Sequence, residues 1–297
     1  MAAPAIRVGR PVEARASRGL WSDAFRRLRR NRPALVGVLF IALFVVTALI
    51  APLIAPYAPL AGTLADRLQP PNTAHLMGTD LQGRDELSRV MYGARVSLVA
   101  GVASVVMGVF IGGLIGALAG GLGGKVDSVL MRVVDVMLAI PGILLAIGIV
   151  AWLDRGLPQI MFAVAMVNVP IFARILRGSL LSLRESDYVI ASRSLGASGF
   201  RVLVRHMLPN SLTPLIVAAT LALATAIIDV AGLGFLGLGP PDPRTPEWGT
   251  MLTDSTKFLR QAPWLIIFPG LAIVVSAVGF NLLGDGLRES LDPRLKQ

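Results

Sequence analysis

Long apolar runs, separated by polar segments that carry glycine and proline, dominate this chain. A bilayer crossing needs about 20 mostly apolar residues. Six runs approach or reach this length, and each is expected to be a helix because a helix satisfies its own backbone hydrogen bonds in lipid. The predicted spans are residues 34–54, 96–120, 133–153, 159–176, 211–231 and 264–284. The pattern therefore predicts an all-α integral membrane protein with six transmembrane helices.

Composition supports this class. Hydrophobic residues make up 54% of the 297 positions and charged residues 15%, whereas soluble domains carry about 25% charged residues. The absence of cysteine excludes disulfides and thiolate metal sites. The two histidines, His75 and His206, are far apart in sequence. We therefore expect no metal or cofactor bound by this chain.

The distribution of Arg and Lys predicts which side of the membrane each loop occupies. If the N-terminus is cytoplasmic, 20 of the 28 basic residues fall on the cytoplasmic side and 8 on the other. Cytoplasmic loops carry the excess of basic residues, so both termini are predicted to be cytoplasmic. The expected layout is a cytoplasmic segment 1–33, a first helix 34–54, an extracytoplasmic loop 55–94, a transmembrane domain 95–284 and a cytoplasmic tail 285–297.

The N-terminal segment contains nine arginines before residue 33, within a chain of net charge +10. Such a run can bind nucleic acid, but here it adjoins a membrane span. Anionic membrane lipid is therefore the expected partner, and nucleic acid is not. The segment is also not expected to be a cleaved signal peptide, because the apolar run is too long and 33 residues precede it.

Four glycines recur every four residues in the second predicted span, at Gly108, Gly112, Gly116 and Gly120. This spacing places them on one helix face, where two backbones can approach closely. Packing within the chain is favoured, and packing against a partner subunit is the alternative.

Polar and ionisable residues inside the predicted spans are few, and such residues are often functional. Asp135 follows Arg132 by three residues, so a structural ion pair is expected. Asp229 lies near the outer end of the fifth span, while Asn168 and Pro170 interrupt the fourth. These last three residues are candidates for lining a pathway, with packing as the alternative. The scarcity of buried carboxylates argues against a proton- or sodium-driven carrier.

Two long segments face the outer side in this layout. In the segment before the second span, Asp80 or Gly83 is expected to start an amphipathic helix that lies on the membrane surface. Asp85 and Glu86 would occupy its first turn, where the helix dipole favours acids. The other segment, residues 232–261, contains LGPPDP, which cannot form a regular helix, so a re-entrant turn buried in protein is expected. Together they can form a vestibule for a ligand.

The polar segment between the fourth and fifth spans, residues 182–210, has the pattern of two short helices joined at a glycine. Ser182 is expected to cap the first helix with Glu185 in its first turn. Gly196 is expected to end that helix in a left-handed conformation, and Ser198 to cap the second. A helix seated in a groove is a common docking mode. The segment is therefore a candidate docking elbow, and an interfacial helix without a partner is the alternative.

These residues resemble a known motif. In permease subunits of bacterial ABC importers the coupling motif reads EAA, three residues, G, nine residues, I, one residue, LP. Here it stands as Ile190-Ala191-Ser192, then Gly196, then His206, Leu208 and Pro209. Ile190 and His206 replace the Glu and Ile of the motif, which weakens the expectation of a Glu contact. The resemblance implies that the residues coupling to the ATPases are Glu185, Tyr188, Ile190, Ala191, Ser192, Leu195, Gly196, Arg201, His206, Leu208 and Pro209.

Further blocks resemble the dipeptide and oligopeptide permease branch, and especially its second permease subunit. They include RRNRPALVG (29–37), GTDLQGRDELSRVMYGARVSL (78–98), PEWGTML (246–252) and FNLLGDGLRESLDPRLKQ (280–297). The resemblance implies a type I ABC importer permease fold in the bacterial cytoplasmic (inner) membrane. It also implies as partners a homologous permease, two cytoplasmic ATPases that bind ATP and Mg, and an extracytoplasmic peptide-binding protein.

The chain shows no GxxxxGK(S/T) phosphate loop, so ATP hydrolysis is expected on the partner ATPases and no enzymatic activity on this chain. The predicted function is ATP-driven import of dipeptides by alternating access. Oligopeptides, glutathione, haem and nickel chelates are alternative cargoes. An ion-coupled carrier and a non-transporting membrane scaffold are alternatives of other classes.

Overall fold

The structure is a computed structural model that describes residues 25–242 and 244–291. Its α-helices, in chain order, are α2 (Arg32–Ile54), α3 (Glu86–Leu122), α4 (Gly124–Ala139), α5 (Gly142–Leu153), α6 (Leu157–Arg184), α7 (Asp187–Ser194), α8 (Gly199–Val202), α9 (Leu208–Leu233), α10 (Trp248–Ser255) and α11 (Trp264–Leu291). Shorter turns are the 3-10 turns η1 (Leu64–Asp66) and η4 (Thr256–Phe258) and the π-helical turns η2 (Leu203–Met207) and η3 (Gly234–Leu238).

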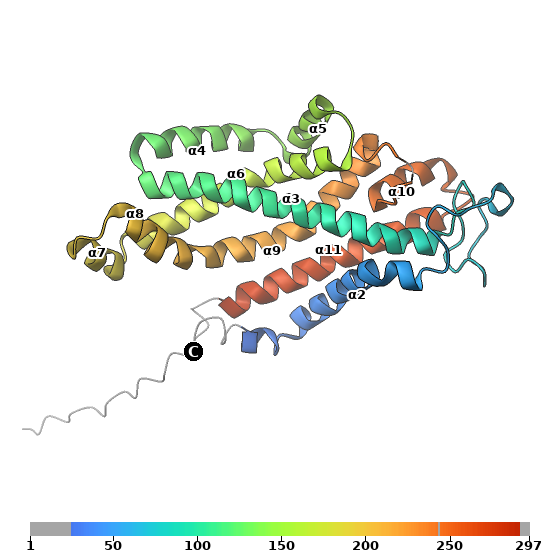
Figure 1. The fold of residues 1–297 in the computed structure, drawn as a ribbon, viewed down its shortest axis with the longest axis horizontal. Helices are drawn as coiled ribbons and strands as arrows, with labels where there is room; N and C mark the ends of the chain where they lie inside the picture. The colour runs from blue at the N-terminus through green and yellow to red at the C-terminus, as the bar shows by residue number, and fades with distance from the viewer. Residues whose placement is uncertain (1–24, 243, 292–297) are drawn as a thin grey trace, which may run out of the picture.

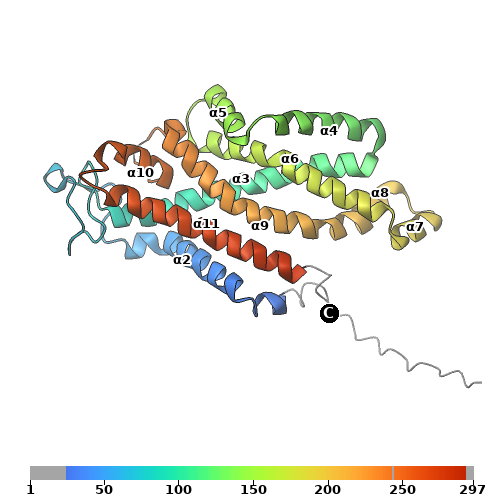
Figure 2. The ribbon, with the colours of Figure 1, turned by 180° about the vertical axis from the view of Figure 1, so that it is seen from behind.

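The long helices run side by side, with α7 and α8 at one end of the bundle and the loop before α3 at the other (Figure 1). Within the described residues, five helices are long and apolar enough to cross a membrane, or six if the bent pair α4 and α5 counts as one span. The view from behind shows α9 between α6 and α11 (Figure 2). Helix α9 packs against α3, α6 and α11, and helix α2 packs against α11. The predicted all-α class is confirmed.

Among the described helices, α3 and α6 make the most extensive contact, and the glycine spacing explains it. A Cβ added at Gly108, Gly112 or Gly116 would meet a carbonyl oxygen of the α6 backbone, and one at Gly120 would touch Leu180. Side chains at these positions would push the two backbones apart. The four glycines therefore pack within the chain. Their spacing in the sequence favours this interpretation over packing against a partner subunit.

The third span was predicted wrongly as one helix over residues 133–153. The chain instead forms α4 and α5, which meet at an angle of 96°. Pro141 is the physical reason, because proline disfavours the helical conformation at the residue before it. Ile140 is accordingly extended, with φ −95° and ψ 128°. At about 1.5 Å per residue, the 12 residues of α5 are too short to cross a hydrocarbon core of roughly 30 Å alone.

The predicted surface helix before the second span is also wrong. Residues 86–95 are the first turns of α3, which continues without a break for 37 residues. Asp85 is its N-cap, accepting a hydrogen bond from the N–H of Ser88 at 2.8 Å, so it precedes the first turn. The early turns pack against α10 instead of lipid, since Gly93 leaves room for the ring of Trp248. Burial against protein therefore replaces the expected burial against the membrane surface.

The ends of the chain differ in part from the predicted layout. Helix α11 continues to Leu291, so most of the described part of the predicted tail 285–297 is helical. Residues 1–24 of the predicted cytoplasmic segment and residues 292–297 of the tail lie outside the described residues. The start of α2 and the end of α11 point toward the end of the bundle that carries α7 and α8 (Figure 1).

Candidate functional site

The elbow, residues 185–207, comprises α7, the turn at Gly196, α8 and η2, and it joins α6 to α9 (Figure 1). Gly196 has a φ of +84°, which is the left-handed conformation predicted for it, and its N–H donates to the carbonyl of Arg193 at 2.9 Å. Ser198 caps α8 as predicted, accepting a hydrogen bond from the N–H of Arg201 at 3.4 Å. The segment is therefore a hydrogen-bonded turn between two short helices.

The cap of the first elbow helix was predicted at the wrong residue. Helix α6 continues through Ser182 to Arg184, and Ser186 occupies the N-cap position of α7. Glu185 lies between the two helices instead of in a first turn. The residues around Ser182 are mostly leucine and arginine, which are good helix formers and give the helix no reason to stop there.

One face of the elbow is anchored in the protein and the other is exposed. Val189, Val202 and Met207 are buried in the core that also contains α6 and α9 side chains. Leu195 and Phe200 are 89% and 78% exposed. Buried anchors fix the elbow to the bundle, while large exposed apolar side chains are typical of surfaces that meet a partner.

We define the elbow surface as Tyr188, Ile190, Leu195 and Phe200, all exposed. Phe200 is absent from the predicted coupling residues, although an apolar residue in the first turn of a capped, basic helix was a usable signal. Among the other predicted coupling residues, Glu185, Ala191, Gly196, Arg201 and Pro209 are exposed, and Ser192, His206 and Leu208 are partly buried. The predicted set lies in one short segment of the chain, and its role in coupling stays a prediction.

Polar contacts tie the base of the elbow to neighbouring helices. Arg184, the last residue of α6, donates from Nη2 to the carbonyl of Gly121 at 2.8 Å, near the end of α3. A cation is favourable there because the end of a helix exposes unsatisfied carbonyls. The base of the elbow therefore contacts α3, in addition to its chain connections to α6 and α9.

Two ion pairs join α4 to α6. Arg177 contacts Asp127 through two bonds of 2.5 and 2.6 Å, and Arg174 contacts Asp135 at 2.6 Å. The predicted pairing of Asp135 with Arg132 is therefore wrong. Residue spacing along one helix cannot show that α4 lies beside α6. That arrangement brings Arg174 of α6 to Asp135 of α4.

The structure places the candidate pathway residues in different surroundings. Asn168 is buried at 4% exposure, donates to the carbonyl of Val164 at 2.9 Å, and lies beside Gly108 at the contact of α6 with α3. Pro170 is buried in α6, and Asp229 is partly buried on α9. A role for these three residues in lining a pathway stays a prediction.

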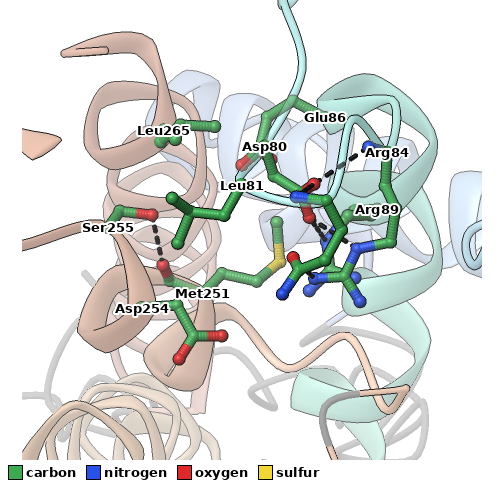
Figure 3. Close-up of a pocket in the computed structure, with 10 residues that line it drawn as sticks. Asp80, Leu81, Arg84, Glu86, Arg89, Met251, Asp254, Ser255 and Leu265 are labelled. Atoms are coloured by element: carbon green, nitrogen blue, oxygen red, sulfur yellow. Dashed lines mark hydrogen bonds and ion pairs between the residues drawn. The ribbon is translucent and has the colours of Figure 1, made fainter. Parts of the chain in front are cut away.

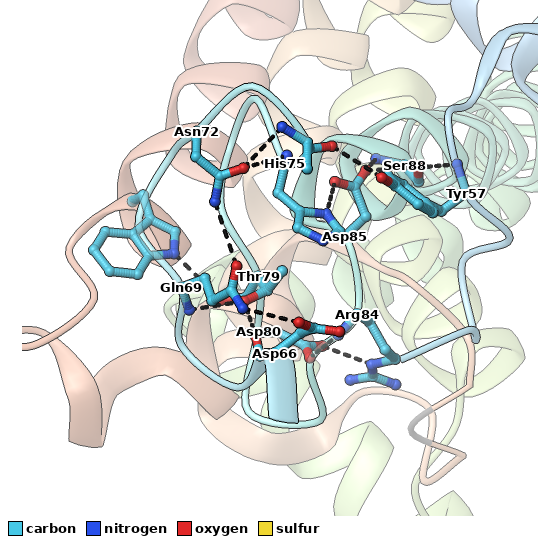
Figure 4. A network of polar contacts seen from close by, with 12 residues as sticks. Tyr57, Asp66, Gln69, Asn72, His75, Thr79, Asp80, Arg84, Asp85 and Ser88 are labelled. Atoms are coloured by element: carbon cyan, nitrogen blue, oxygen red, sulfur yellow. Dashed lines mark hydrogen bonds and ion pairs between the residues drawn. The ribbon is translucent and has the colours of Figure 1, made fainter. Parts of the chain in front are cut away.

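The end of the bundle opposite the elbow carries a folded loop held by a polar network (Figure 4). His75 Nδ1 contacts Asp85 at 2.9 Å, and the Ser88 hydroxyl donates to the same carboxylate at 2.7 Å. The backbone N–H of Tyr57 donates to Ser88 Oγ at 3.1 Å, and the Tyr57 ring lies 4.8 Å from that of His75. The network fixes this loop on the first turn of α3, so it forms a defined surface.

A second cluster at this end contains charges from α3, the preceding loop and α10 (Figure 3). Arg84 Nε donates to Asp80 at 2.6 Å, and Arg89 Nε lies 3.4 Å from the same carboxylate. A cavity of about 10 Å³ beside them is lined by Glu86 and Asp254 as well, and has room for about one water molecule. These charges were not among the predicted site residues, because their contacts join segments far apart in sequence.

Glu247 is the N-cap residue of α10, in the segment predicted as a buried turn. Its carboxylate accepts hydrogen bonds from the N–H groups of Gly249 and Thr250, both at 2.8 Å, and thereby caps the helix. Burial raises the pKa of Glu247, and the two N–H donors partly offset that effect. The described residues between η3 and α10, 239–242 and 244–247, contain no helix, as LGPPDP predicts, but the segment after them does.

Residues 112–297 match the family described as binding-protein-dependent transport system inner membrane component. This chain belongs to that family. Residues 19–71 also match the N-terminal TM domain of oligopeptide transport permease C. The protein is thus a multi-pass permease of the inner membrane and a subunit of an ABC importer. Such importers work with ATPases and a binding protein, to which this permease contributes the membrane component.

Two curated relatives align with nearly the whole permease. The dipeptide transport system permease protein DppC of Alkalihalophilus pseudofirmus is 45% identical over 276 residues, covering 93% of this chain and 90% of the relative. The glutathione transport system permease protein GsiD of Shigella flexneri is 47% identical over 277 residues, covering 93% and 91%. A chain of the MetNI methionine ABC transporter, solved in an inward-facing conformation, has a TM-score of 0.58 at 21% identity, over 69% of this chain and 96% of that one. This last similarity establishes the type I ABC importer permease fold.

Proposed function

We propose that this permease carries dipeptides across the inner membrane and that ATP hydrolysis on partner subunits drives the transport. Support for the cargo comes from relatives, including a di/tripeptide permease DppC of Pseudomonas aeruginosa that is 46% identical over 92% of this chain. The glutathione permease is equally similar. Glutathione, itself a short peptide, is therefore the second candidate cargo.

The elbow surface is the observation that carries the proposed mechanism. It exposes four large apolar or aromatic side chains at one end of the bundle, while its opposite face is buried among α6 and α9. A partner that moves the elbow would move two long helices with it. We infer that cytoplasmic ATPases bind this surface and that ATP and Mg bind to those ATPases.

We infer alternating access from this arrangement. Closure of the ATPases around ATP would displace the elbow, and α6 and α9 would open a pathway toward the binding protein. Hydrolysis would reverse the movement and release the peptide inward. A homologous second permease would supply the other half of the pathway. The excess of basic residues on one side, 20 against 8, supports a cytoplasmic location for both termini and the elbow.

Uptake by cells with and without this gene tests the cargo. We would compare labelled dialanine, a pentapeptide, glutathione and nickel, each with the wild-type gene restored as a control. Loss of dialanine uptake on deletion, with recovery on restoration, is the expected result. Unchanged dialanine uptake with loss of glutathione uptake would replace the cargo. Unchanged uptake of every ligand, in a strain lacking other peptide importers, would contradict the proposal.

A further inference from the structure

A cavity of about 280 Å³ lies at the end of the bundle opposite the elbow. It is bordered by the glycine-rich turn η3, by the following Pro240 and Pro241, and by α10. Known ligand pockets measure roughly 300–1,000 Å³, so this cavity suits a small ligand. Four charged residues line the cavity, two basic and two acidic: Arg89, Arg155, Asp242 and Asp254.

Arg89 is the buried cation of this cavity. The residue is 3% exposed, and its Nε lies 3.4 Å from Asp80. Its Nη1 is buried and has no hydrogen-bond partner. A buried guanidinium with an unpartnered N–H is costly, and the fork of its N–H groups matches a carboxylate. Arg89 is therefore suited to receive a carboxylate from outside the chain.

Asp254 is the acid that accompanies it. It lies on α10 and lines both this cavity and the smaller one, as Arg89 does. Figure 3 shows Asp254 and Arg89 on opposite sides of the smaller cavity. Among the described residues, no side chain or backbone group forms a hydrogen bond or ion pair with the Asp254 carboxylate. Partial burial raises the pKa of this carboxyl, and Arg89 opposes that effect.

The other two charges differ from this pair. Arg155, Asp242 and Asp254 are all exposed, but Asp242 lies 3.4 Å from Arg244. Asp242 therefore has a partner already, while Asp254 and the Nη1 of Arg89 do not. The cavity thus offers a carboxylate that makes no ion pair with the described residues and a guanidinium with one unpartnered N–H group.

We propose that this cavity is a subsite for the main chain of a small zwitterionic peptide, with Arg89 facing its carboxylate and Asp254 its ammonium group. The proposal rests on the proposed function, because it assigns a place on the permease to the same cargo. The side chains of the peptide would face the open part of the cavity, where the turn η3 presents glycine and leaves space. The permease would then recognise the two free termini shared by dipeptides, whatever their side chains.

Direct binding to the complete transporter, reconstituted in lipid nanodiscs without its binding protein, tests the subsite. Equilibrium dialysis would measure labelled dialanine and N-acetyl-dialanine, which lacks the ammonium group. We compare the wild type with Asp254→Asn, and use Asp242→Asn as the matched control because it makes the same change at an exposed, paired acid. Asp254 has no structural partner to lose, so folding is expected to survive its substitution.

Asp254→Asn is expected to weaken dialanine binding about tenfold or more, the size typical of a lost charge-assisted hydrogen bond. Binding of N-acetyl-dialanine should be weak in all three proteins, and Asp242→Asn should match the wild type. Arg89→Lys, which keeps the charge but removes the fork, should weaken dialanine binding as well. Its folding is checked by thermal melting.

Equal dialanine binding by the wild type and Asp254→Asn would overturn the subsite, and so would an absence of dialanine binding to the wild type. In either case, ATP-driven dialanine uptake by the wild type with its binding protein would leave the proposed function standing. Failure of that uptake in the same preparation would instead reject the proposed function.

Discussion

Substitution of Gly196 separates the role of the elbow turn from the folding of the long helices. The φ of Gly196 is +84°, whereas proline fixes φ near −65°. Proline would also remove the N–H that donates to the Arg193 carbonyl at 2.9 Å. Gly196→Pro therefore cannot preserve this turn. Nothing lies within 4 Å of an added Cβ, so Gly196→Asn fits, and asparagine tolerates left-handed backbone.

The backbone angle and the N–H group at position 196 determine how much each variant destabilises the turn. Gly196→Pro should destabilise the turn by about 3 kcal/mol or more, enough to populate other elbow conformations almost completely. Gly196→Asn should cost about 1 kcal/mol or less. Because the residue is exposed and makes no packing contact, the long helices should still insert and pack in both variants.

The assay is dialanine uptake and ATPase activity of the reconstituted transporter, with membrane content of the permease measured by immunoblot. Gly196→Pro should be present at wild-type levels but should reduce uptake to background and remove stimulation of the ATPase by the loaded binding protein. Gly196→Asn should retain most of both activities. Normal uptake by Gly196→Pro at normal membrane content would refute the coupling role of the turn.

Two further pairs of substitutions test the packing that supports the elbow. Gly112→Leu would drive a side chain into the α6 backbone, and overpacking of this kind costs about 1–3 kcal/mol. Thermal melting in detergent should show a clearly lower melting temperature for this variant than for the control Gly113→Ala. The Cβ added in the control has its nearest neighbour at 3.8 Å. Asp127→Asn should cost about 1–3 kcal/mol, because its arginine pair is two-bonded and partly buried. Asp135→Asn removes an exposed pair and should cost under about 1 kcal/mol, and equal losses for the two aspartates would contradict this reasoning.

The sequence predicts the helical elements and the elbow well because their signals are local. Apolar runs of span length, a glycine that permits a left-handed turn, and a serine before a basic helix each act within a few residues. The bend at Pro141 was a local signal too, but the apolar residues on both sides of it hid the break. Hydropathy averages over the run and does not register that Pro141 disfavours the helical conformation at Ile140.

Contacts between distant segments could not be predicted in this way. The partner of Asp135 lies on α6, and the partners of Arg89 come from the loop before α3, with Asp254 from α10 nearby. Such pairs depend on how helices are placed in three dimensions. Burial of Asn168 against α3 likewise follows from the glycine face opposite it, which spacing within α6 does not reveal.

The central claim is that ATP hydrolysis on partner subunits drives dipeptide transport through this permease. The most direct measurement is accumulation of labelled dialanine in proteoliposomes that contain the complete transporter, with the binding protein on one side and ATP on the other. The account predicts accumulation that requires both ATP and the binding protein and that is lost in Gly196→Pro. Accumulation without ATP, driven by an ion gradient alone, would contradict it.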